Sequence, residues 1–283
     1  MKIIRQVVCG IIRRIKRMFV VEIVKVCKYE VVSDNALSGR RILVTGGSSG
    51  IGLAMAKKFL AQGAEVVVTG RNAAKLEKAV LDVASPHLKG LVWDIADIGI
   101  IESKLDEAEL MLGGRIDVCV NNAGVAIRQY PGVLTEAVWD SIMAINLKAP
   151  VFVAQSIVNK WMVRGVKGVV LNISSFAGVE PALDAYSSSK CALNSMVKGM
   201  ARTWAMHGIR INAIAPGVVV GTDVREFQRK TDPNGNVYSH WIPMGRYGVP
   251  DEIAELAAFL VSDRAAYITG EIIGCDGAGA LRQ

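Results

Sequence analysis

From Gly39 onward, short apolar runs alternate with longer stretches in which apolar residues recur at helical spacing. Apolar runs bounded by turn residues predict strands, and helices are expected to begin near Gly50 and Ala73. Strands that are apolar almost throughout are covered on both faces, which is typical of parallel sheets. The pattern therefore predicts an α/β domain, a doubly wound parallel sheet flanked by helices. The predicted strands are Arg41–Thr45, Glu65–Thr69, Gly90–Trp93, Ile116–Val120, Val169–Ile173, Arg210–Ile214 and Ile272–Cys275.

The first 38 residues follow a different pattern. Residues 1–19 place their apolar side chains at helical spacing with the bases largely on the other side, which predicts a basic amphipathic helix. Residues 20–32 are rich in β-branched side chains and fit a strand equally well, and 33–35 read as a linker. We therefore divide the chain into an N-terminal extension, residues 1–38, and one α/β domain, residues 39–283.

Charge separates these two parts. The net charge of the 283 residues is +7. Residues 1–38 carry eight bases and three acids, net +5, whereas the domain carries 25 bases and 23 acids. A nearly balanced domain gives no support for nucleic-acid binding. Bases interrupt the apolar residues of the extension, so no run is long enough for a secretory signal or a membrane span, although its basic face could lie on an anionic membrane surface.

The five cysteines are scattered, odd in number and without a Cys-x-x-Cys pair. This arrangement predicts neither a disulfide framework nor a zinc site, and it favours the reducing cytoplasm. The three histidines are isolated in sequence, and we expect no metal site.

Tyr186 and Lys190 stand four residues apart in Tyr-Ser-Ser-Ser-Lys, which places both on one face of a helix. A phenol is a poor acid at neutral pH because its ordinary pKa is about 10. A nearby ammonium favours the phenolate and lowers that pKa. The pair therefore suits proton transfer to or from a carbonyl or alcohol oxygen, although the spacing alone also fits an ordinary surface pair.

A glycine-rich loop follows the first predicted strand, in Thr45-Gly-Gly-Ser-Ser-Gly-Ile-Gly. Glycine permits a sharp turn and lets the backbone approach a pyrophosphate, which then faces the N–H groups at the start of the helix. Such loops also serve plain packing, so the loop alone does not decide the matter. The residues expected to contact a cofactor that carries such a pyrophosphate are Gly46, Ser48, Ser49, Gly50, Ile51 and Gly52.

Polar residues also follow the third and fourth strands. Asp94, followed by Ile95, can accept a hydrogen bond from an adenine amino group. Asn122, in Asn-Asn-Ala-Gly with Ala123 and Gly124, can tie neighbouring strand ends together beside the cofactor.

With Asn146, Ser174-Ser175, Pro216-Gly217 and Tyr186-x-x-x-Lys190, these motifs resemble the short-chain dehydrogenase/reductase superfamily from about Gly39 to Leu281. The resemblance implies a Rossmann-type subunit, a nicotinamide cofactor and hydride transfer between a ketone and a secondary alcohol.

The resemblance also implies roles for four residues. Ser175, which begins Ser-x-x-Gly, holds the substrate oxygen, with Ser174 as a nearby competitor for that role. Tyr186 donates or removes the proton. Lys190 holds the nicotinamide ribose and lowers the pKa of Tyr186. Asn146 anchors a water that relays protons to Lys190.

The end of the second strand bears on the cofactor. Dehydrogenases that use NAD commonly carry an acid there, whereas this chain has Gly70 followed by Arg71. Arg71 could pair with a 2′-phosphate, so NADP(H) is favoured and NAD(H) remains possible. Further cofactor contacts are expected from Pro216, Gly217, Val219 and Thr222.

Two positions depart from the family pattern. The separation of 11 residues between Ser175 and Tyr186 is slightly shorter than in many relatives. Many relatives carry a threonine five residues after the proline of Pro-Gly, where this chain has Gly221, and Thr222 follows one residue later.

Residues 218–247 are expected to cover the substrate, and their apolar side chains favour a bulky or apolar molecule. A hydroxysteroid, a 3-oxoacyl thioester and a sugar or polyol all stay open, with Arg128, Glu180 and Asp184 available to polar groups. The rival to an enzyme is a non-catalytic scaffold, which would not require Ser175, Tyr186 and Lys190.

The resemblance further implies a homotetramer built on helices near Leu147–Trp161 and Ser187–His207 and on the C-terminal strand. Residues 1–38 either brace that tetramer, lie on a membrane surface or stay flexible.

Overall fold

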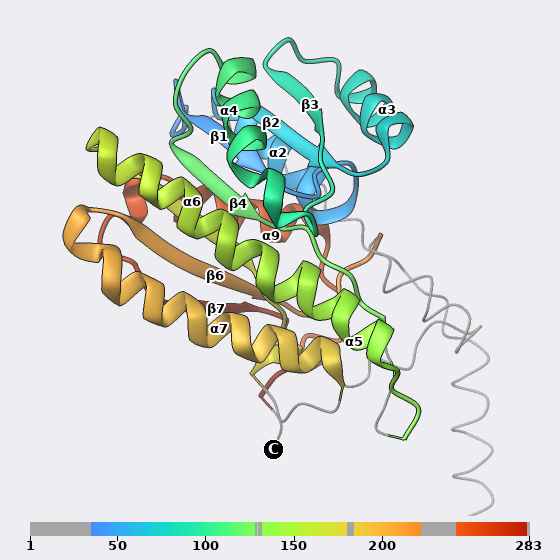
Figure 1. Cartoon of the computed structure of the whole chain (residues 1–283). Helices are drawn as coiled ribbons and strands as arrows, with labels where there is room; N and C mark the ends of the chain where they lie inside the picture. Colours follow the sequence, from blue (N-terminus) through green and yellow to red (C-terminus); the bar gives the residue numbers. More distant parts are fainter. Residues whose placement is uncertain (1–34, 128, 130–131, 180–183, 222–241, 282–283) are drawn as a thin grey trace, which may run out of the picture. The chain divides into compact units, whose positions relative to one another are not determined.

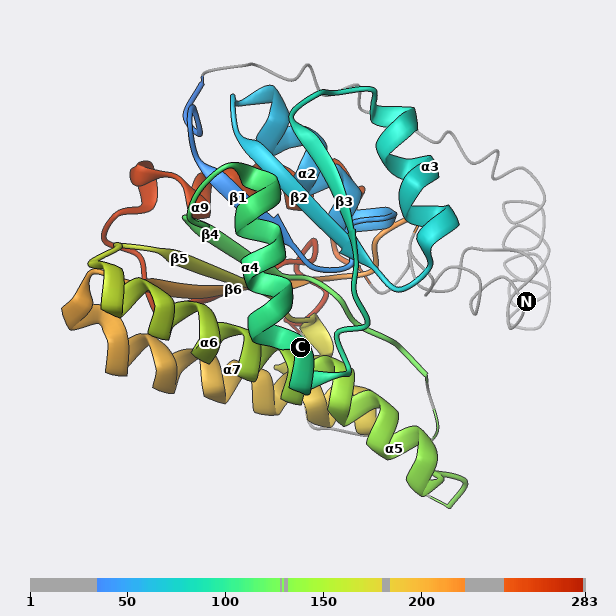
Figure 2. The same ribbon diagram turned by 45° about the horizontal axis from the view of Figure 1, so that its top comes forward.

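Within the described residues, which are 35–127, 129, 132–179, 184–221 and 242–281, seven parallel strands form one sheet in the order β3-β2-β1-β4-β5-β6-β7 (Figures 1 and 2). The extension predicted for residues 1–38 lies almost wholly outside these ranges. The strands are β1 (Arg41–Val44), β2 (Glu65–Gly70), β3 (Leu88–Val92), β4 (Val118–Asn121), β5 (Val169–Ile173), β6 (Arg210–Pro216) and β7 (Ile272–Cys275).

The predicted parallel sheet is therefore confirmed, and two of the predicted strands, β5 and β7, have the expected bounds. The others differ by one or two residues at an end. For example, β3 begins at Leu88, two residues earlier than predicted, and ends at Val92. The prediction extended to Trp93 because this buried residue continues the apolar run beyond the strand.

The strand order reverses at β1, which lies between β2 and β4. The connection after β1 runs over one face of the sheet, and the connection after β4 runs over the other face. Between the carboxyl ends of these two strands the backbone diverges, and this is where doubly wound sheets bind their ligands. The segments after β1 and β4 carry the glycine loop and Asn122, so the topology brings these two predicted motifs together.

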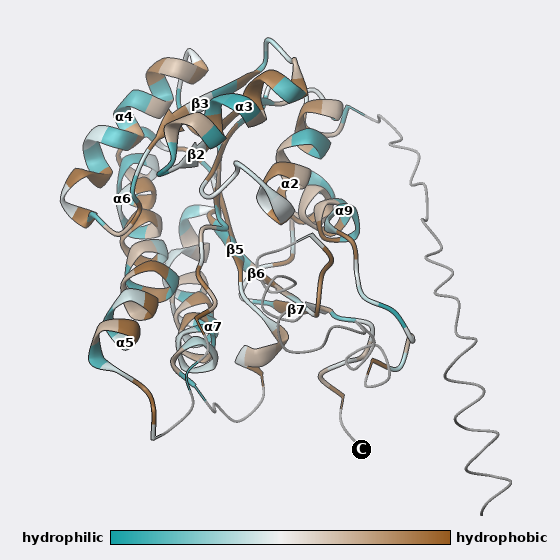
Figure 3. Cartoon of the chain, turned by 90° about the vertical axis from the view of Figure 1, so that its right-hand side faces the viewer, coloured by the Kyte–Doolittle hydropathy of each residue, from teal (hydrophilic) through white to brown (hydrophobic). Residues whose placement is uncertain are grey.

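Helices cover both faces of the sheet (Figure 3). On one side lie α4, α6 and α7, and on the other lie α2, α3 and α9. Their bounds are α2 (Gly50–Ala61), α3 (Ala73–Val83), α4 (Ile101–Leu112), α5 (Glu136–Met143), α6 (Ala149–Arg164), α7 (Ala185–Trp204) and α9 (Pro250–Val261).

Alternation along each strand divides the core into two layers. In β1, Leu43 packs with the cluster beneath α4, α6 and α7, whereas Ile42 and Val44 pack with the cluster beneath α2 and α9. Val67 of β2 and its two neighbours divide in the same way. All of these side chains are completely buried. This explains why the strands are apolar almost throughout: each face of the sheet has its own helical cover.

α5 and α6 form one continuous helical segment, Glu136–Arg164, interrupted by a π turn at Ala144–Lys148. Among the described residues this segment alone is long and apolar enough to span a membrane, by length and composition. Half of its most apolar window is buried within the protein. Residues such as Val153 and Ile157 pack on the sheet, so the apolar character is that of a core helix.

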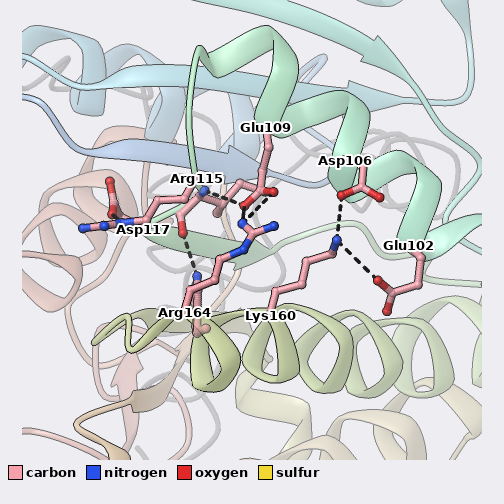
Figure 4. Close-up of polar contacts among 9 residues, drawn as sticks. Glu102, Asp106, Glu109, Arg115, Asp117, Lys160 and Arg164 are labelled. Atoms are coloured by element: carbon pink, nitrogen blue, oxygen red, sulfur yellow. Dashed lines mark hydrogen bonds and ion pairs between the residues drawn. The ribbon is translucent and has the colours of Figure 1, made fainter.

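Ion pairs join α4 to α6 along their solvent-facing edge (Figure 4). Lys160 Nζ of α6 lies 2.6 Å from Asp106 Oδ1 and 3.5 Å from Glu102 Oε2. One turn later, Arg164 Nη1 donates to both carboxylate oxygens of Glu109, at 2.7 and 2.9 Å. Because the carboxylates of Glu102 and Asp106 are largely exposed, each of their bonds to Lys160 contributes little to stability. Apolar burial therefore dominates the packing of α4 against α6.

Trp161, near the end of α6, is fully buried, and its Nε1 donates to the Ile116 carbonyl at 2.6 Å. Trp161→Phe removes the donor and leaves a cavity. We expect it to lower the free energy of unfolding by about 2–4 kcal/mol. Urea unfolding followed by far-UV circular dichroism measures this. Trp139→Phe on α5, at a side chain 40% exposed, is the matched control and should change stability by less than about 0.5 kcal/mol. Equal effects of the two substitutions would contradict the prediction.

Candidate functional site

The glycine loop between β1 and α2 leaves no room for side chains at two positions. Gly46 has a positive φ of 68°, and a Cβ there would lie 2.8 Å from the Ala123 Cα. A Cβ on Gly52 would lie 2.4 Å from the Gly46 carbonyl oxygen and 2.5 Å from Asn122 Nδ2. The loop is therefore packed tightly against the segment that follows β4, so these two glycines serve packing, and the approach of a pyrophosphate stays a prediction.

Asn122 and Thr45 bind the ends of β1 and β4 to each other. Asn122 Nδ2 donates to the carbonyls of Thr45 and Gly46, both at 2.9 Å. In return, Thr45 Oγ1 accepts from the N–H groups of Asn122 and Ala123 at 3.0 and 3.1 Å. The expectation that Asn122 ties strand ends together is confirmed. The reciprocal role of Thr45 was missed, although its place at the end of the strand could have indicated it.

The start of α2 is suited to an anion. Ser49 is the N-cap residue, but its side chain makes no capping hydrogen bond. The N–H groups of the first turn of α2 therefore lack a side-chain acceptor from Ser49. The positive end of the helix dipole lies at the same place. The absence of side chains at Gly46 and Gly52 lets the loop before α2 pack closely on the segment after β4. These features fit a dinucleotide pyrophosphate, so the residues present suit the predicted cofactor.

At the end of β2, Ser48 lies beside Gly70: a Cβ on Gly70 would lie 3.4 Å from Ser48 Oγ. Arg71 follows and is exposed, and Asn72 caps α3 by accepting from the Lys75 N–H at 2.8 Å. The three residues Gly70, Arg71 and Asn72 carry no carboxylate. The positive charge of Arg71 therefore stands where an acid would repel a 2′-phosphate.

Asp94 and Ile95 follow β3 and face different surroundings. Asp94 is exposed, and its Oδ1 accepts from the Ala96 N–H at 3.1 Å. Ile95 is buried in the core beneath α4. Contact with an adenine stays a prediction for both residues, and the burial of the Ile95 side chain leaves its backbone for that role.

The π turn aims the side chain of Asn146 at the segment after β4. Asn146 Oδ1 accepts from the Val125 N–H, and its Nδ2 donates to the Val125 carbonyl, both at 2.9 Å. Nδ2 also lies 3.3 Å from Ser189 Oγ of α7. The amide is thus held at both ends. The predicted water relay stays a prediction.

Lys190 is buried, and its Nζ donates to the Ile173 carbonyl at 2.8 Å. Burial lowers the pKa of Lys190 to about 8. The same Nζ lies 5.8 Å from the centroid of the Tyr186 ring, so the two side chains share one face of α7 as predicted. A Cβ on Gly124 would lie 3.3 Å from Asn146 Oδ1 and 3.7 Å from Lys190 Nζ, which places all three residues around one point.

The two adjacent serines after β5 have different partners. Ser174 Oγ donates to Asn194 Oδ1 of α7 at 2.6 Å. Ser175 instead caps the short helix η3 (Phe176–Gly178), where its Oγ accepts from the Ala177 N–H at 3.2 Å. The Ser174 proton is therefore committed within the protein, which favours Ser175 as the hydroxyl that holds a substrate oxygen.

Residues after β6 close the far side of the site. Pro216 ends the strand, and the Gly217 N–H donates to the Cys275 carbonyl at 3.0 Å. Val219 is buried beneath α9 and bridges in parallel to Gly248. Its cofactor contact stays a prediction and would have to involve its backbone.

Several predicted residues contribute differently or lie outside the described ranges. Asp184 caps α7 by accepting from the Ser187 N–H at 2.7 Å, so this carboxylate serves the helix. Thr222, Arg128, Glu180 and most of the predicted substrate cover lie outside the described residues.

Comparison with known proteins adds independent information. The sequence model of a family described as enoyl-(acyl carrier protein) reductase matches residues 46–278. Gluconate 5-dehydrogenase of Gluconobacter oxydans is 34% identical over 250 residues, covering 86% of this chain and 95% of that protein. A 3-oxoacyl-(acyl-carrier-protein) reductase of Thermotoga maritima is 33% identical, covering 85% and 98%. An Agrobacterium tumefaciens protein solved with bound NADP is 33% identical, with a TM-score of 0.78, covering 88% and 99%.

The buried amine of Lys190 predicts a specific pH dependence of stability without cofactor. Its pKa is about 8 in the folded protein and 10.5 ordinarily, so between these values the unfolded chain binds more protons. Stability therefore rises with pH in that window. Lys190→Met lacks this titration. We expect the free energy of unfolding of the wild type, relative to the variant, to increase by about 3 kcal/mol across the window.

Urea unfolding at several pH values, followed by circular dichroism, measures that difference. Lys198→Met, at an exposed position of the same helix, is the matched control and should leave the pH dependence unchanged. A difference between wild type and Lys190→Met that stays flat above pH 8 would contradict the prediction.

Proposed function

Because this chain belongs to the short-chain dehydrogenase/reductase superfamily, we propose that it is an NADP(H)-dependent oxidoreductase that interconverts a ketone and a secondary alcohol. The observation that carries the proposal is the pairing of Tyr186 with the buried Lys190, whose Nζ lies 5.8 Å from the phenol ring. Ser175 is on the loop packed against the same helix. The rival, a non-catalytic scaffold, would need none of these groups.

We assign one task to each side chain. Ser175 Oγ hydrogen-bonds the substrate oxygen and orients the carbonyl. Tyr186 gives its proton to that oxygen during reduction and removes it during oxidation. Lys190 stabilises the phenolate with its positive charge and binds the ribose of the cofactor. When bound, the nicotinamide supplies or accepts the hydride.

Asn146 fixes the elements that carry these side chains. Its two hydrogen bonds to Val125 and its contact with Ser189 link the segment after β4 to α7. We propose that it also holds the water through which Lys190 exchanges protons. The convergence of Asn146 Oδ1 and Lys190 Nζ beside Gly124 supports that proposal.

NADP(H) is favoured over NAD(H) for two reasons. Arg71 follows β2 with no acid beside it, and a guanidinium can pair with a phosphate through two hydrogen bonds. A structural neighbour was solved with NADP bound. The pyrophosphate is expected at the start of α2, with contacts from Ser48 and Ile51 of the glycine loop.

The proposed substrate is a molecule that carries a ketone or a secondary alcohol. The names of the relatives range from a sugar acid to an acyl thioester, and both contain a ketone or secondary alcohol at the reacting carbon. The hydroxysteroid stays a prediction from the apolar residues within 218–247. A panel of ketones read by NADPH and NADH absorbance would separate the three classes.

We propose a homotetramer, supported by large exposed apolar side chains such as Phe152 and Met196 on α6 and α7. Residues 1–38 are proposed to brace that assembly, with a membrane surface as the alternative. The cytoplasm stays the predicted compartment, on the argument of the scattered cysteines.

Tyr186→Phe tests the proposed acid. It keeps the ring and removes the proton, so we expect turnover to fall by about 10²–10⁴-fold while NADPH still binds. Initial rates with the best ketone of the panel measure turnover, and NADPH fluorescence titration measures binding. Tyr267→Phe, at a fully exposed tyrosine, is the matched control. Undiminished turnover of Tyr186→Phe would refute the assignment.

Arg71→Ala tests the cofactor preference. Loss of a charge-assisted pair with the 2′-phosphate should raise KM for NADPH by about 10–100-fold and leave KM for NADH nearly unchanged. Steady-state rates with both cofactors measure the two constants. Lys57→Ala, at an exposed position of α2, controls for a general loss of positive charge. Equal changes for both cofactors would remove the argument from Arg71.

A further inference from the structure

One face of α7 binds the end of β5 and the loop that follows it at three points. Tyr186, Lys190 and Asn194 are spaced four residues apart, so they form one stripe along the helix. Lys190 Nζ binds the Ile173 carbonyl at 2.8 Å, immediately before the loop. Asn194 supplies the other two contacts. The loop between them carries Ser175.

The Asn194 amide uses both of its ends on this loop. Its Oδ1 accepts from Ser174 Oγ at 2.6 Å, and its Nδ2 donates to the Gly178 carbonyl at 3.0 Å. The two partners therefore bracket Ser175 on both sides. Their chemistry also fixes the orientation of the amide, because a flipped amide would set its oxygen against the Gly178 carbonyl.

The contact is buried and tight. Asn194 is 8% exposed and Ser174 is 4% exposed, so a lost hydrogen bond would not be replaced readily by water. A Cβ on Gly178 would lie 2.8 Å from the Lys190 carbonyl carbon and 3.0 Å from Asn194 Nδ2. The loop thus approaches α7 as closely as a bare backbone permits.

The proposed reaction gives this spacing a consequence. Ser175 and Tyr186 must both reach one substrate oxygen, yet they belong to different elements, the β5–η3 loop and α7. Hydrogen bonds weaken steeply with distance and angle, so a small displacement of the loop separates the two hydroxyls.

We propose that Asn194 is a positioning residue that sets the distance between Ser175 and Tyr186, with Ser174 as its hydroxyl partner. The inference rests on the proposed function, because it acts through Ser175. Asn194 touches neither the substrate nor the cofactor. Its whole effect on the reaction passes through the loop.

A double-mutant cycle tests this. Asn194→Ala should lower kcat by about 10–100-fold, the scale expected for a misplaced group, and leave the NADPH dissociation constant unchanged. In a Ser175→Ala background the same substitution should lower kcat no further, since the group that it positions is already absent. A merely structural role would disturb Tyr186 as well and lower kcat in both backgrounds.

Two further variants complete the experiment. Ser174→Ala removes only one of the two hydrogen bonds and should give a smaller loss, absent again in the Ser175→Ala background. If Asn194→Ala does not fold, the comparison of Ser174→Ala in the two backgrounds tests the positioning role instead. Ser195→Ala, at the exposed neighbouring position, is the matched control and should leave kcat unchanged.

The outcomes are distinguishable. Equal losses of kcat with and without Ser175, an unchanged kcat in Asn194→Ala, or weakened NADPH binding would each overturn the positioning role. Wild-type turnover of Ser175→Ala alone would instead refute the role that the proposed function gives to Ser175.

Discussion

The structure depends on the hydrogen bonds that close the gap between the carboxyl ends of β1 and β4. The strand order reverses there, so the backbones diverge and leave polar groups without sheet partners. Asn122 and Thr45 satisfy those groups mutually, at 2.9 to 3.1 Å. The glycine loop is thereby fixed against the segment after β4. Because the same segment leads to Val125, the clamp also determines where Asn146 finds its partner.

The proposed catalytic residues rely on α7 in a comparable way. Tyr186, Lys190 and Asn194 occupy one stripe, and each neighbouring element contacts that stripe or its flank. In the part of the chain that the structure describes, no carboxylate pairs with the buried Lys190, and the shift of its pKa to about 8 reflects the cost of burying its charge. Groups that perform chemistry are commonly held in such unfavourable surroundings, and the apolar layers on both sheet faces provide the stability that offsets them.

Much of this architecture could be predicted from the sequence, because the apolar runs of a doubly wound sheet are local patterns. β5 and β7 were placed at their observed bounds for that reason, and the shared helix face of Tyr186 and Lys190 followed from their spacing, whereas their proposed roles came from the family resemblance. The pairs Ser174–Asn194 and Asn146–Val125 could not be predicted, since 20 and 21 residues separate their members and the intervening path sets their contact. Asn194 did continue the spacing of Tyr186 and Lys190, and that signal could have indicated it. Residues 1–38 and Thr222 remain predictions.

The π turn at Ala144–Lys148 has a consequence for how this helix can change during evolution. One residue more than an α-helical turn rotates everything that follows by about 100° around the axis. The segment before the turn and the segment after it therefore differ in phase by that fixed angle from one unbroken α-helix. The offset lets Asn146 reach Val125 while Val153 and Ile157 of α6 pack on the sheet. A deletion of a single residue at the turn would couple the two halves and force one of them to face the wrong way.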